Sequence, residues 1–362
     1  ATGAINGIDK EGCKGLTGEK MTGANALENM DFTGDDGTWV TLANSEPDEN
    51  GIFTFYFPQL SVFVSDPANP QPEEMPSKTG YPMSDGTFAP AAPTFITNAE
   101  ELQAINNNLS GVYRLANDID MTGFTFTPIG SEDTPFTGIF DGNGYEVQNL
   151  TIDNSTSDYQ GLFGTVGTDG KVMNVGVSGS ITANDYVGGI VGYNNGKITG
   201  CYSKATIIGH NAVGGVVGDN EDGMLTNSYN TGDVSGNKDV GGIVGKNEER
   251  TLNCYNTGYV NGSQYVGGVA GENYSGVILN CYNIGEVTGS DDVGGVAGYN
   301  FSDAIMNCYY CTDTSGSATG ATHGKDTKNC KGLTAEQMTG ANALDNMSFS
   351  SDAGTWVTLA NE

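Results

Sequence analysis

Three acidic side chains could perform chemistry together: Asp118, Asp120 and Asp141. Paired carboxylates carry out the acid–base steps of glycoside hydrolysis, and clustered carboxylate oxygens bind Ca²⁺. However, the sequence has no Asp-x-Asp-x-Asp-Gly calcium loop, and turn capping would also explain acids in these segments. We therefore expect no catalytic residue and no cofactor, with calcium at these three acids as the alternative.

Histidine and cysteine add little further chemistry. The two histidines, His210 and His323, stand in no zinc-binding spacing and have no companion pattern for a nucleophilic triad. Cys308 and Cys311 have the Cys-x-x-Cys spacing of a redox or metal half-site, but no second pair accompanies them. Cys311 and Cys330 lie outside the repeat described below, and we predict that they form a disulfide.

The charge of the chain excludes some partners. Its 362 residues include 44 Asp and Glu against 14 Lys and Arg, which gives a formal net charge of −30. Nucleic acids and anionic membranes attract basic patches, so we expect neither partner. No run approaches the roughly 18 apolar residues of a membrane span, and no basic start with an apolar stretch marks a signal peptide. The many Gly, Asn, Thr and Tyr residues favour an exported piece of a protein.

The elements that must position these residues repeat along the chain. A Val-Gly-Gly arm begins at Val187, Val213, Val240, Val266 and Val293, so the period is 26 or 27 residues. Each period holds short β-branched runs between Gly, Asn, Ser and Asp, with no stretch long enough for a helix. A fixed period of this length predicts a solenoid. We expect an all-β fold, a right-handed parallel β-helix with coils about 4.8 Å apart.

Equivalent positions of successive coils should form columns along this solenoid. Val and Ile would line the interior at Ile190, Val216, Ile243, Val269 and Val296. One asparagine slot recurs at Asn194, Asn220, Asn247, Asn273 and Asn300. An asparagine there should tolerate a left-handed backbone, and its amide should hydrogen-bond to the coils above and below.

A cysteine column and a tyrosine column occupy adjacent slots. The cysteines are Cys201, Cys254, Cys281 and Cys308, with Ser228 in the same slot. The tyrosines are Tyr202, Tyr229, Tyr255, Tyr282 and Tyr309. Apolar residues flank both slots, so the sequence leaves open which column faces inward. If the tyrosines face outward, they form an aromatic stripe suited to sugars or protein partners.

The two ends of the chain are near-copies of each other. Residues 1–44 match residues 318–361 at a constant offset of 317, and the first copy continues into a strongly apolar strand pattern at 51–60. Two interpretations follow: a tandem array of modules, or a head-to-tail filament in which residues 1–64 cover the end of a neighbouring chain. The candidate assembly residues are Cys13, Trp39, Phe53, Phe55, Phe57 and Trp356.

The coils resemble a known family. Gly-Gly-Ile-Val-Gly and Asn-Cys-Tyr-Asn-Thr-Gly are similar to the GLUG-motif repeats of large bacterial surface proteins, which also occur beside the metallopeptidase domain of IgA-cleaving peptidases. The capped helix expected at 96–105, followed by 113–120 and 136–144, resembles the usual opening of such a β-helix. The resemblance covers residues 94–362. It implies bacterial surface display and transfers no catalytic residue, because the family's peptidase chemistry lies in another domain.

The sequence thus predicts five parts. Residues 1–64 close a preceding module, 65–93 form a linker with seven prolines, 94–159 form an opening cap with one short helix, 160–310 form the regular coils, and 311–362 form a closing cap that repeats 1–45. We expect a non-enzymatic extracellular module for adhesion or as a structural stalk, with assembly through 1–64 and 318–362 as a variant. Its partner would be a protein or carbohydrate surface ligand, or copies of itself. The alternative is a carbohydrate-active enzyme or the accessory region of a surface peptidase.

Overall fold

The computed structural model describes residues 39–40, 52–56, 59–60, 77–301, 304–315, 320–323, 327–328, 330–339, 343, 346 and 347. The chain divides into two units, Ala1–Thr94 and Phe95–Glu362, which are described separately. In the described residues, no helix has both the length and the apolar character that crossing a membrane requires.

The first unit contains two small antiparallel sheets. β1 (Trp39–Val40) pairs with β3 (Gln59–Leu60), and β2 (Phe53–Tyr56) pairs with β4 (Ser77–Pro82), which also pairs with β5 (Phe88–Ala89). The predicted linker is therefore wrong for residues 77–89. A turn joins β4 to β5. In this turn the Asp85 carboxylate accepts a hydrogen bond of 2.9 Å from the Thr87 amide. The prolines concealed this hairpin, because Pro82 and Pro90 stand at its strand ends, where proline is tolerated.

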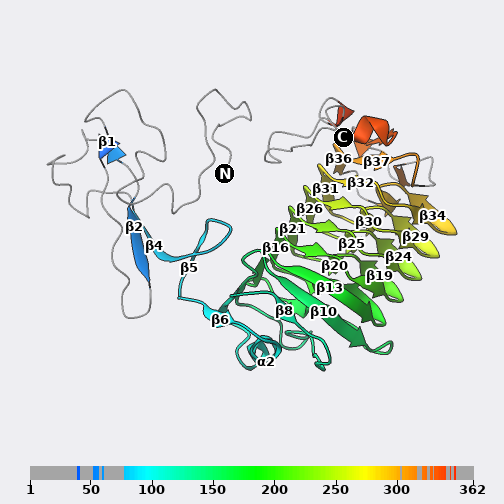
Figure 1. Ribbon diagram of the computed structural model, residues 1–362. Helices are drawn as coiled ribbons and strands as arrows, with labels where there is room; N and C mark the ends of the chain where they lie inside the picture. The colour runs from blue at the N-terminus through cyan, green and yellow to red at the C-terminus, as the bar shows by residue number, and fades with distance from the viewer. Residues whose placement is uncertain are drawn as a thin grey trace. The chain divides into compact units, whose positions relative to one another are not determined.

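A capped helix opens the second unit. β6 (Thr94–Ile96) leads into α2 (Ala99–Gln103), and a 3₁₀ turn, η4 (Ala104–Asn107), continues it. Asn98 is the N-cap and accepts from the Glu101 amide at 2.9 Å, while the Glu101 carboxylate accepts from the Thr97 amide at 2.7 Å. This reciprocal pattern satisfies one free amide of the first turn and the amide of Thr97. Leu102 is fully buried, so the helix covers the first coil as expected (Figure 1).

Five short strands make up each regular coil. The coil that begins at Asp185 contains β14 (Asp185–Gly188), β15 (Val191–Asn194), β16 (Lys197–Thr199), β17 (Tyr202–Ser203) and β18 (Thr206–Ile208). Each strand pairs in parallel with its equivalent in the next coil. The strands therefore stack in rows (Figure 1), and the fold is the parallel β-helix that the period predicts.

The stacked strands form four parallel sheets in the described part of the chain. The first runs through β14, β19 (Asn211–Gly214), β24 (Lys238–Gly241), β29 (Gln264–Gly267) and β34 (Asp291–Gly294). The second runs through β11 (Phe163–Val166), β15, β20 (Val217–Asn220), β25 (Val244–Asn247), β30 (Ala270–Asn273), β35 (Ala297–Asn300) and β38 (Ala321–Thr322). The third runs through β6, β7 (Val112–Leu115), β9 (Ile139–Asp141), β12 (Lys171–Met173), β16, β21 (Met224–Thr226), β26 (Arg250–Leu252), β31 (Val277–Leu279), β36 (Ile305–Met306) and β39 (Thr327–Lys328).

The fourth sheet is branched, because one long strand near its start, β13 (Gly176–Thr182), pairs with two short strands of the next coil, β17 and β18. It contains β8 (Ile119–Asp120), β10 (Glu146–Asp153) and β13 (Gly176–Thr182). One branch continues through β17, β22 (Tyr229–Asn230), β27 (Tyr255–Asn256), β32 (Tyr282–Asn283), β37 (Tyr309–Cys311) and β40 (Lys331–Leu333). The other continues through β18, β23 (Val234–Ser235), β28 (Val260–Asn261) and β33 (Val287–Thr288). A final 3₁₀ turn, η5, spans Glu336–Met338.

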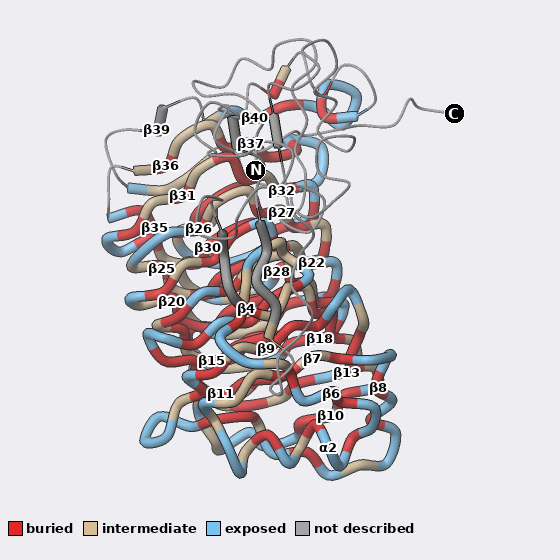
Figure 2. The backbone as a smooth tube through the Cα atoms, turned by 90° about the vertical axis from the view of Figure 1, so that its left-hand side faces the viewer, coloured by how far each residue is buried: buried red, intermediate tan, exposed pale blue. Residues whose placement is uncertain are grey.

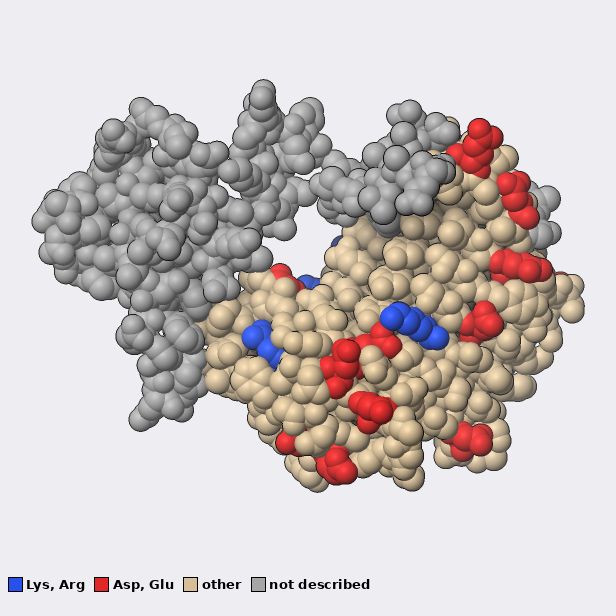
Figure 3. All heavy atoms as spheres, in the orientation of Figure 1, with Lys and Arg blue, Asp and Glu red and all other residues tan. Residues whose placement is uncertain are grey.

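The interior is one continuous apolar core. The predicted Val and Ile column (Ile190, Val216, Ile243, Val269 and Val296) is fully buried, and Figure 2 shows buried positions following every coil. The cysteine column also faces inward, since Cys201, Cys254, Cys281 and Cys308 are fully buried. The adjacent tyrosine column faces outward, because successive residues of a strand point to opposite sides. On the side drawn in Figure 3, acidic side chains are more abundant than basic ones.

Buried asparagines join the coils as predicted. Their side-chain amides form a ladder, in which each Nδ2 donates to the next Oδ1 at 2.7, 3.1, 2.8 and 2.9 Å from Asn194 to Asn300. The expected left-handed backbone lies elsewhere, so that part of the prediction is wrong. Positive φ angles of 50–57° occur instead in the slot before the cysteines, at Asn174, Asn227, Asn253, Asn280 and Asn307.

A tyrosine ladder as the candidate functional site

Four tyrosines stack face to face along the outside of the fourth sheet. Tyr202, Tyr229, Tyr255 and Tyr282 have ring centroids 4.9–5.0 Å apart and interplanar angles of 4–7°. Each is half-buried. We call these four residues the tyrosine ladder. Tyr309 was predicted to belong to the same stripe, but it is fully buried with Cys311, Leu333 and Met338 in a second small core. The stripe therefore ends at Tyr282.

Stacking determines what the tyrosine ladder can bind. Rings 5 Å apart and nearly parallel cover one another's faces, so the ladder presents ring edges and hydroxyl groups to the outside. Each stacked pair contributes about 0.5–1.5 kcal/mol beyond the area it buries. The ladder thus stabilises the coil stack and offers a periodic row of hydroxyls, rather than the open ring faces on which a sugar would stack.

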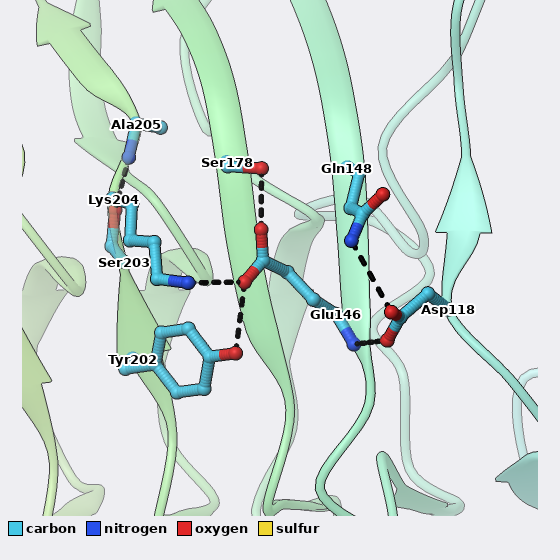
Figure 4. Close-up of polar contacts among 8 residues, drawn as sticks. All are labelled: Asp118, Glu146, Gln148, Ser178, Tyr202, Ser203, Lys204 and Ala205. Atoms are coloured by element: carbon cyan, nitrogen blue, oxygen red, sulfur yellow. Dashed lines mark hydrogen bonds and ion pairs between the residues drawn. The ribbon is translucent and has the colours of Figure 1, made fainter.

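A polar network terminates the tyrosine ladder at its first member (Figure 4). The Tyr202 hydroxyl donates to Glu146 Oε2 at 2.9 Å, and Lys204 Nζ donates to the same oxygen at 2.7 Å. Ser178 donates to Glu146 Oε1 at 2.6 Å. The amide of Glu146 in turn donates to Asp118 Oδ1 at 2.9 Å. The network links the first strands of the sheet to the regular coils.

Gly176 makes this network possible. In the parallel register Gly176 lies between Glu146 and Tyr202. A Cβ atom at Gly176 would lie 2.1 Å from Cζ of Tyr202, so the ring crosses the space that a side chain would fill. Tyr202 therefore reaches Glu146 over a position that only glycine permits.

The network fixes the ionisation of its members. Burial tends to raise the pKa of Glu146, but hydrogen bonds from Lys204, Ser178 and Tyr202 outweigh it and hold the pKa below its usual range. The hydrogen bond to Glu146 raises the pKa of Lys204. Burial, and then the hydrogen bond to Glu146, raise the pKa of Tyr202. Glu146 is thus a fixed anion paired with a fixed cation, which suits a structural contact and not a proton-transfer step.

The structure does not gather the three acids that the sequence singled out. Asp141 is fully buried and forms an ion pair of 2.8 Å with Arg114. Asp120 accepts from the Thr122 amide at 3.0 Å and from Asn149 at 2.9 Å. Hydrogen bonds from Thr122 and Asn149 lower the pKa of Asp120. In the part of the chain that the structure describes, no three His, Cys, Asp or Glu side chains are arranged to hold a metal ion. Calcium binding at these residues stays a prediction.

The six cysteines in the described part of the chain are free thiols, and the predicted pairing of Cys311 with Cys330 is wrong. Cys311 belongs to the second small core, whereas Cys330 packs against the main core. The two face opposite sides of the sheet because Tyr309 pairs with Lys331 and Cys311 pairs with Leu333, which places Cys330 beside Cys308. Cys308 and Cys311 also point to opposite sides, so they form no half-site. Burial raises the pKa of Cys201 and Cys330 to about 12, so these thiols stay protonated.

The two histidines that the sequence singled out are not part of the ladder. His210 and His323 are exposed and lie 3.3 and 3.2 Å from Asp185 and Asp292. Cys13, Phe57 and Trp356 lie outside the described residues. Trp39, Phe53 and Phe55 lie in β1 and β2, whose backbones alone are described. Their role in assembly stays a prediction.

A hollow of about 340 Å³ lies in the opening cap, near the start of the regular coils. Glu132, Asp133, Asp158 and Tyr159 are among its lining residues. The three acids are exposed to solvent. Burial, and then a hydrogen bond with Glu132, raise the pKa of Tyr159 to about 12, so this hydroxyl is a donor at neutral pH.

Sequence reasoning missed Glu146, Ser178 and Lys204. Glu146 is separated from Lys204 by 58 residues and from Ser178 by 32. The register of the coils offered a signal, because Glu146 precedes Tyr202 by about two periods and occupies the same column. The irregular opening coils hid it.

Comparisons with known proteins agree with the coil repeat. The family described as the GLUG motif matches residues 183–208, 209–235 and 262–288. Halomucin of Haloquadratum walsbyi is 36% identical over 152 residues, which cover 38% of this chain and 2% of halomucin. A "Putative Gly-rich membrane protein" of Evansella cellulosilytica is 35% identical over 118 residues, which cover 29% of this chain and 14% of that protein. The chain thus spans only a small part of these relatives.

A solved structure has the same fold. The crystal structure described as a "putative immunoglobulin A1 protease" from Bacteroides ovatus superposes with a TM-score of 0.53 at 22% identity, over 73% of this chain and 92% of that one. At this identity the likeness concerns the fold alone. The fold is a β-helix, and three stretches of its coils match the GLUG motif.

Proposed function

We propose that this GLUG-repeat β-helix is a non-enzymatic, extracellular module of a bacterial surface protein and serves as a structural stalk. One observation carries the proposal: successive coils repeat the same contacts. The amide ladder joins five coils from Asn194 to Asn300, and the tyrosine ladder joins four from Tyr202 to Tyr282. Contacts spread evenly along an axis suit a spacer, because each coil is held by its neighbours.

The names of the similar proteins support an extracellular location. Halomucin and a Gly-rich membrane protein both contain a stretch like these coils. The net charge of −30 would keep such a module soluble and apart from anionic surfaces. Protease treatment of intact cells that express the parent protein tests this placement, because a surface module is cleaved or released and a cytoplasmic one is protected.

Single-molecule stretching tests the stalk role. The full chain, tethered at its two ends, should hold its folded length and then lengthen in discrete steps. One coil of 26 or 27 residues should release about 90 Å at roughly 3.4 Å per residue, or a multiple of this where coils unfold together. Smooth lengthening without steps would contradict the proposal that the stacked coils resist tension.

Adhesion through the tyrosine ladder is the second candidate, favoured by its half-exposed hydroxyl row. A glycan and protein array probed with the wild-type chain and with Tyr255→Phe tests it. Tyr255→Phe removes one hydroxyl but keeps the stacked ring, so a ligand of the hydroxyl row should bind it more weakly. Equal binding of both chains would exclude the row as the contact.

An enzymatic role is the alternative to both. It predicts release of sugars or peptides when the chain is incubated with a panel of bacterial and host polysaccharides and proteins. Turnover that persists through repurification, and is lost on replacing a single acidic residue, would overturn the non-enzymatic proposal.

Head-to-tail assembly through residues 1–64 and 318–362 is a further part of the proposal, supported by their near-identity. Sedimentation velocity over a hundredfold range of concentration tests it. The wild-type chain should form a growing series of species, and Trp39→Ala should shorten the series. A monomer at all concentrations would remove this part and leave the stalk role standing.

A further inference from the structure

A second outer surface of the β-helix departs from the regular repeat. It is formed by one outward position in each of five neighbouring strands of the second sheet, β15, β20, β25, β30 and β35. Parallel pairing aligns the residues at this position, which are Tyr193, Asp219, Lys246, Glu272 and Tyr299. Tyrosines thus stand at both ends, with charged residues between them. We call this surface, with the neighbouring column described next, the acidic face.

The neighbouring column follows the same order. Tyr186, Ala212, Asp239 and Tyr265 occupy equivalent positions of successive coils, and all four have left-handed backbones with φ of 51–59°. Tyr186 contacts Tyr193 edge to face, with ring centroids 5.7 Å apart. The ring centroids of Tyr265 and Tyr299 lie 4.7 Å apart. Two aromatic pairs therefore flank a centre in which Ala212, Asp219 and Asp239 replace larger side chains.

Two carboxylates in this centre are buried and incompletely satisfied. Asp219 is 3% exposed and Asp239 is 6% exposed. In each, Oδ1 is buried and has no hydrogen-bond partner. A buried polar atom without a partner is unfavourable, so a donor that reached either oxygen would stabilise this centre.

Negative charge exceeds positive charge on the acidic face. The acids Asp219, Glu221, Asp239, Glu248 and Glu272 interact there with two cations, Lys238 and Lys246. Burial, followed by repulsion from other acids, raises the pKa of Asp219 to about 7; burial and the nearby Glu272 raise that of Asp239 to about 6. A further cation would relieve this repulsion.

The two lysines show which kind of cation the face accommodates. Lys238 Nζ lies 3.4 Å from Asp239 and 5.0 Å from the Tyr265 ring centre. Lys246 Nζ pairs with Glu248 and lies 5.3 Å from the Tyr274 ring centre. Each ammonium group thus combines a carboxylate with an aromatic ring, which is a favourable setting for a cation.

We propose that the acidic face binds a lysine side chain of a partner protein segment, whose ammonium group donates to the free Oδ1 atom of Asp219 or Asp239. The flanking pairs Tyr186–Tyr193 and Tyr265–Tyr299 would contact its methylene stem. A long, unbranched stem suits the site, because both Oδ1 atoms are buried. An amino sugar, whose ammonium group is attached directly to the ring, should bind more weakly. This binding site goes beyond the stalk role and does not depend on it.

Titration calorimetry of the full chain with acetylated, amidated tetralysine tests the proposal. We expect saturable binding at pH 8 that weakens at least about tenfold in Asp219→Asn, because a charge-assisted hydrogen bond is lost. Tyr186→Leu should weaken it by about two- to fivefold, because a smaller side chain covers less of the methylene stem. Asp219→Asn keeps the shape of the side chain, and a thermal melt of each variant verifies that it is folded.

Glu286→Gln is the matched control, because it removes one exposed negative charge from the loop between β32 and β33, two strands of the fourth sheet. It should change the affinity less than twofold. Equal weakening in Glu286→Gln and Asp219→Asn would reduce the binding to general attraction by a chain of charge −30 and overturn the proposal, as would the lack of saturable binding. Tighter binding of a glucosamine tetramer than of tetralysine would overturn the assignment of a lysine side chain.

Discussion

Removing one amide from the middle of the asparagine ladder should destabilise the β-helix strongly. Asn247 is fully buried and makes four side-chain hydrogen bonds. It donates to Asn273 Oδ1 at 2.8 Å and to the Glu249 carbonyl at 3.1 Å, and it accepts from Asn220 at 3.1 Å and from Thr251 at 2.8 Å. Asn247→Ala breaks all four and leaves buried partners unsatisfied. At about 1 kcal/mol for each bond, the expected loss is about 3–5 kcal/mol.

The end of the same ladder supplies the matched control. Asn300 is equally buried, but its Nδ2 has no partner and its Oδ1 accepts from Asn273. Because Asn273 Nδ2 also donates to the Gly276 carbonyl, Asn300→Ala should cost only about 1 kcal/mol. The exposed Asn261→Ala should change stability by less than about 0.5 kcal/mol.

Urea unfolding followed by circular dichroism measures the three variants against the wild-type chain. The midpoint should fall most for Asn247→Ala, less for Asn300→Ala and least for Asn261→Ala. If Asn247→Ala and Asn300→Ala lose the same stability, burial of an asparagine and not its ladder bonds determines the effect, and the reasoning fails.

Three further predictions follow from other contacts. Gly176→Ala should displace Tyr202 from Glu146 and reduce stability by about 1–3 kcal/mol, which urea unfolding measures; an unchanged midpoint would show that the ring moves freely. Because burial raises the pKa of Asp219 from 3.8 to about 7, the folded state binds its proton more tightly than the unfolded state, so the stability of the wild-type chain should fall from about pH 4 to pH 7. Asp219→Asn should reduce that fall, as measured by thermal melts across this range, and an identical pH profile would contradict the assignment. Cys201 and Cys254 should resist a thiol reagent in the folded chain and react in urea, because both are fully buried; rapid labelling of either in the folded state, located by mass spectrometry, would contradict their inward orientation.

The sequence predicted the coils because their contacts recur at a fixed spacing. Every Val-Gly-Gly arm lies in register with the next, as Val187 with Val213, so periodicity alone located the strands. It could not decide between the cysteine and tyrosine columns, because the neighbouring positions Ile278 and Leu279 are both apolar. In the structure Ile278 is fully buried and Leu279 is half-exposed. Which of the two side chains points into the core depends on the path of the backbone around the coil.

The functional surfaces were harder to predict because they depend on interruptions of the repeat. Gly176 is informative only once it is known to lie between Glu146 and Tyr202. Likewise Ala212 and Asp239 are informative only once they are known to lie between Tyr186 and Tyr265 in one column. The Cys311–Cys330 prediction failed for a related reason, because closeness in sequence concealed their opposite orientations in the sheet.

Disulfide cross-linking between coils tests the stacked register most directly. Thr231 and Thr257 follow the paired residues Asn230 and Asn256 by one position, so their Cα atoms should lie about one strand spacing apart, within disulfide reach. We expect Thr231→Cys with Thr257→Cys to cross-link on mild oxidation. Thr231→Cys with Ile284→Cys, two coils apart, should not. Cross-linking of the second pair without the first, mapped by mass spectrometry, would contradict the stacking on which the stalk and both surfaces depend.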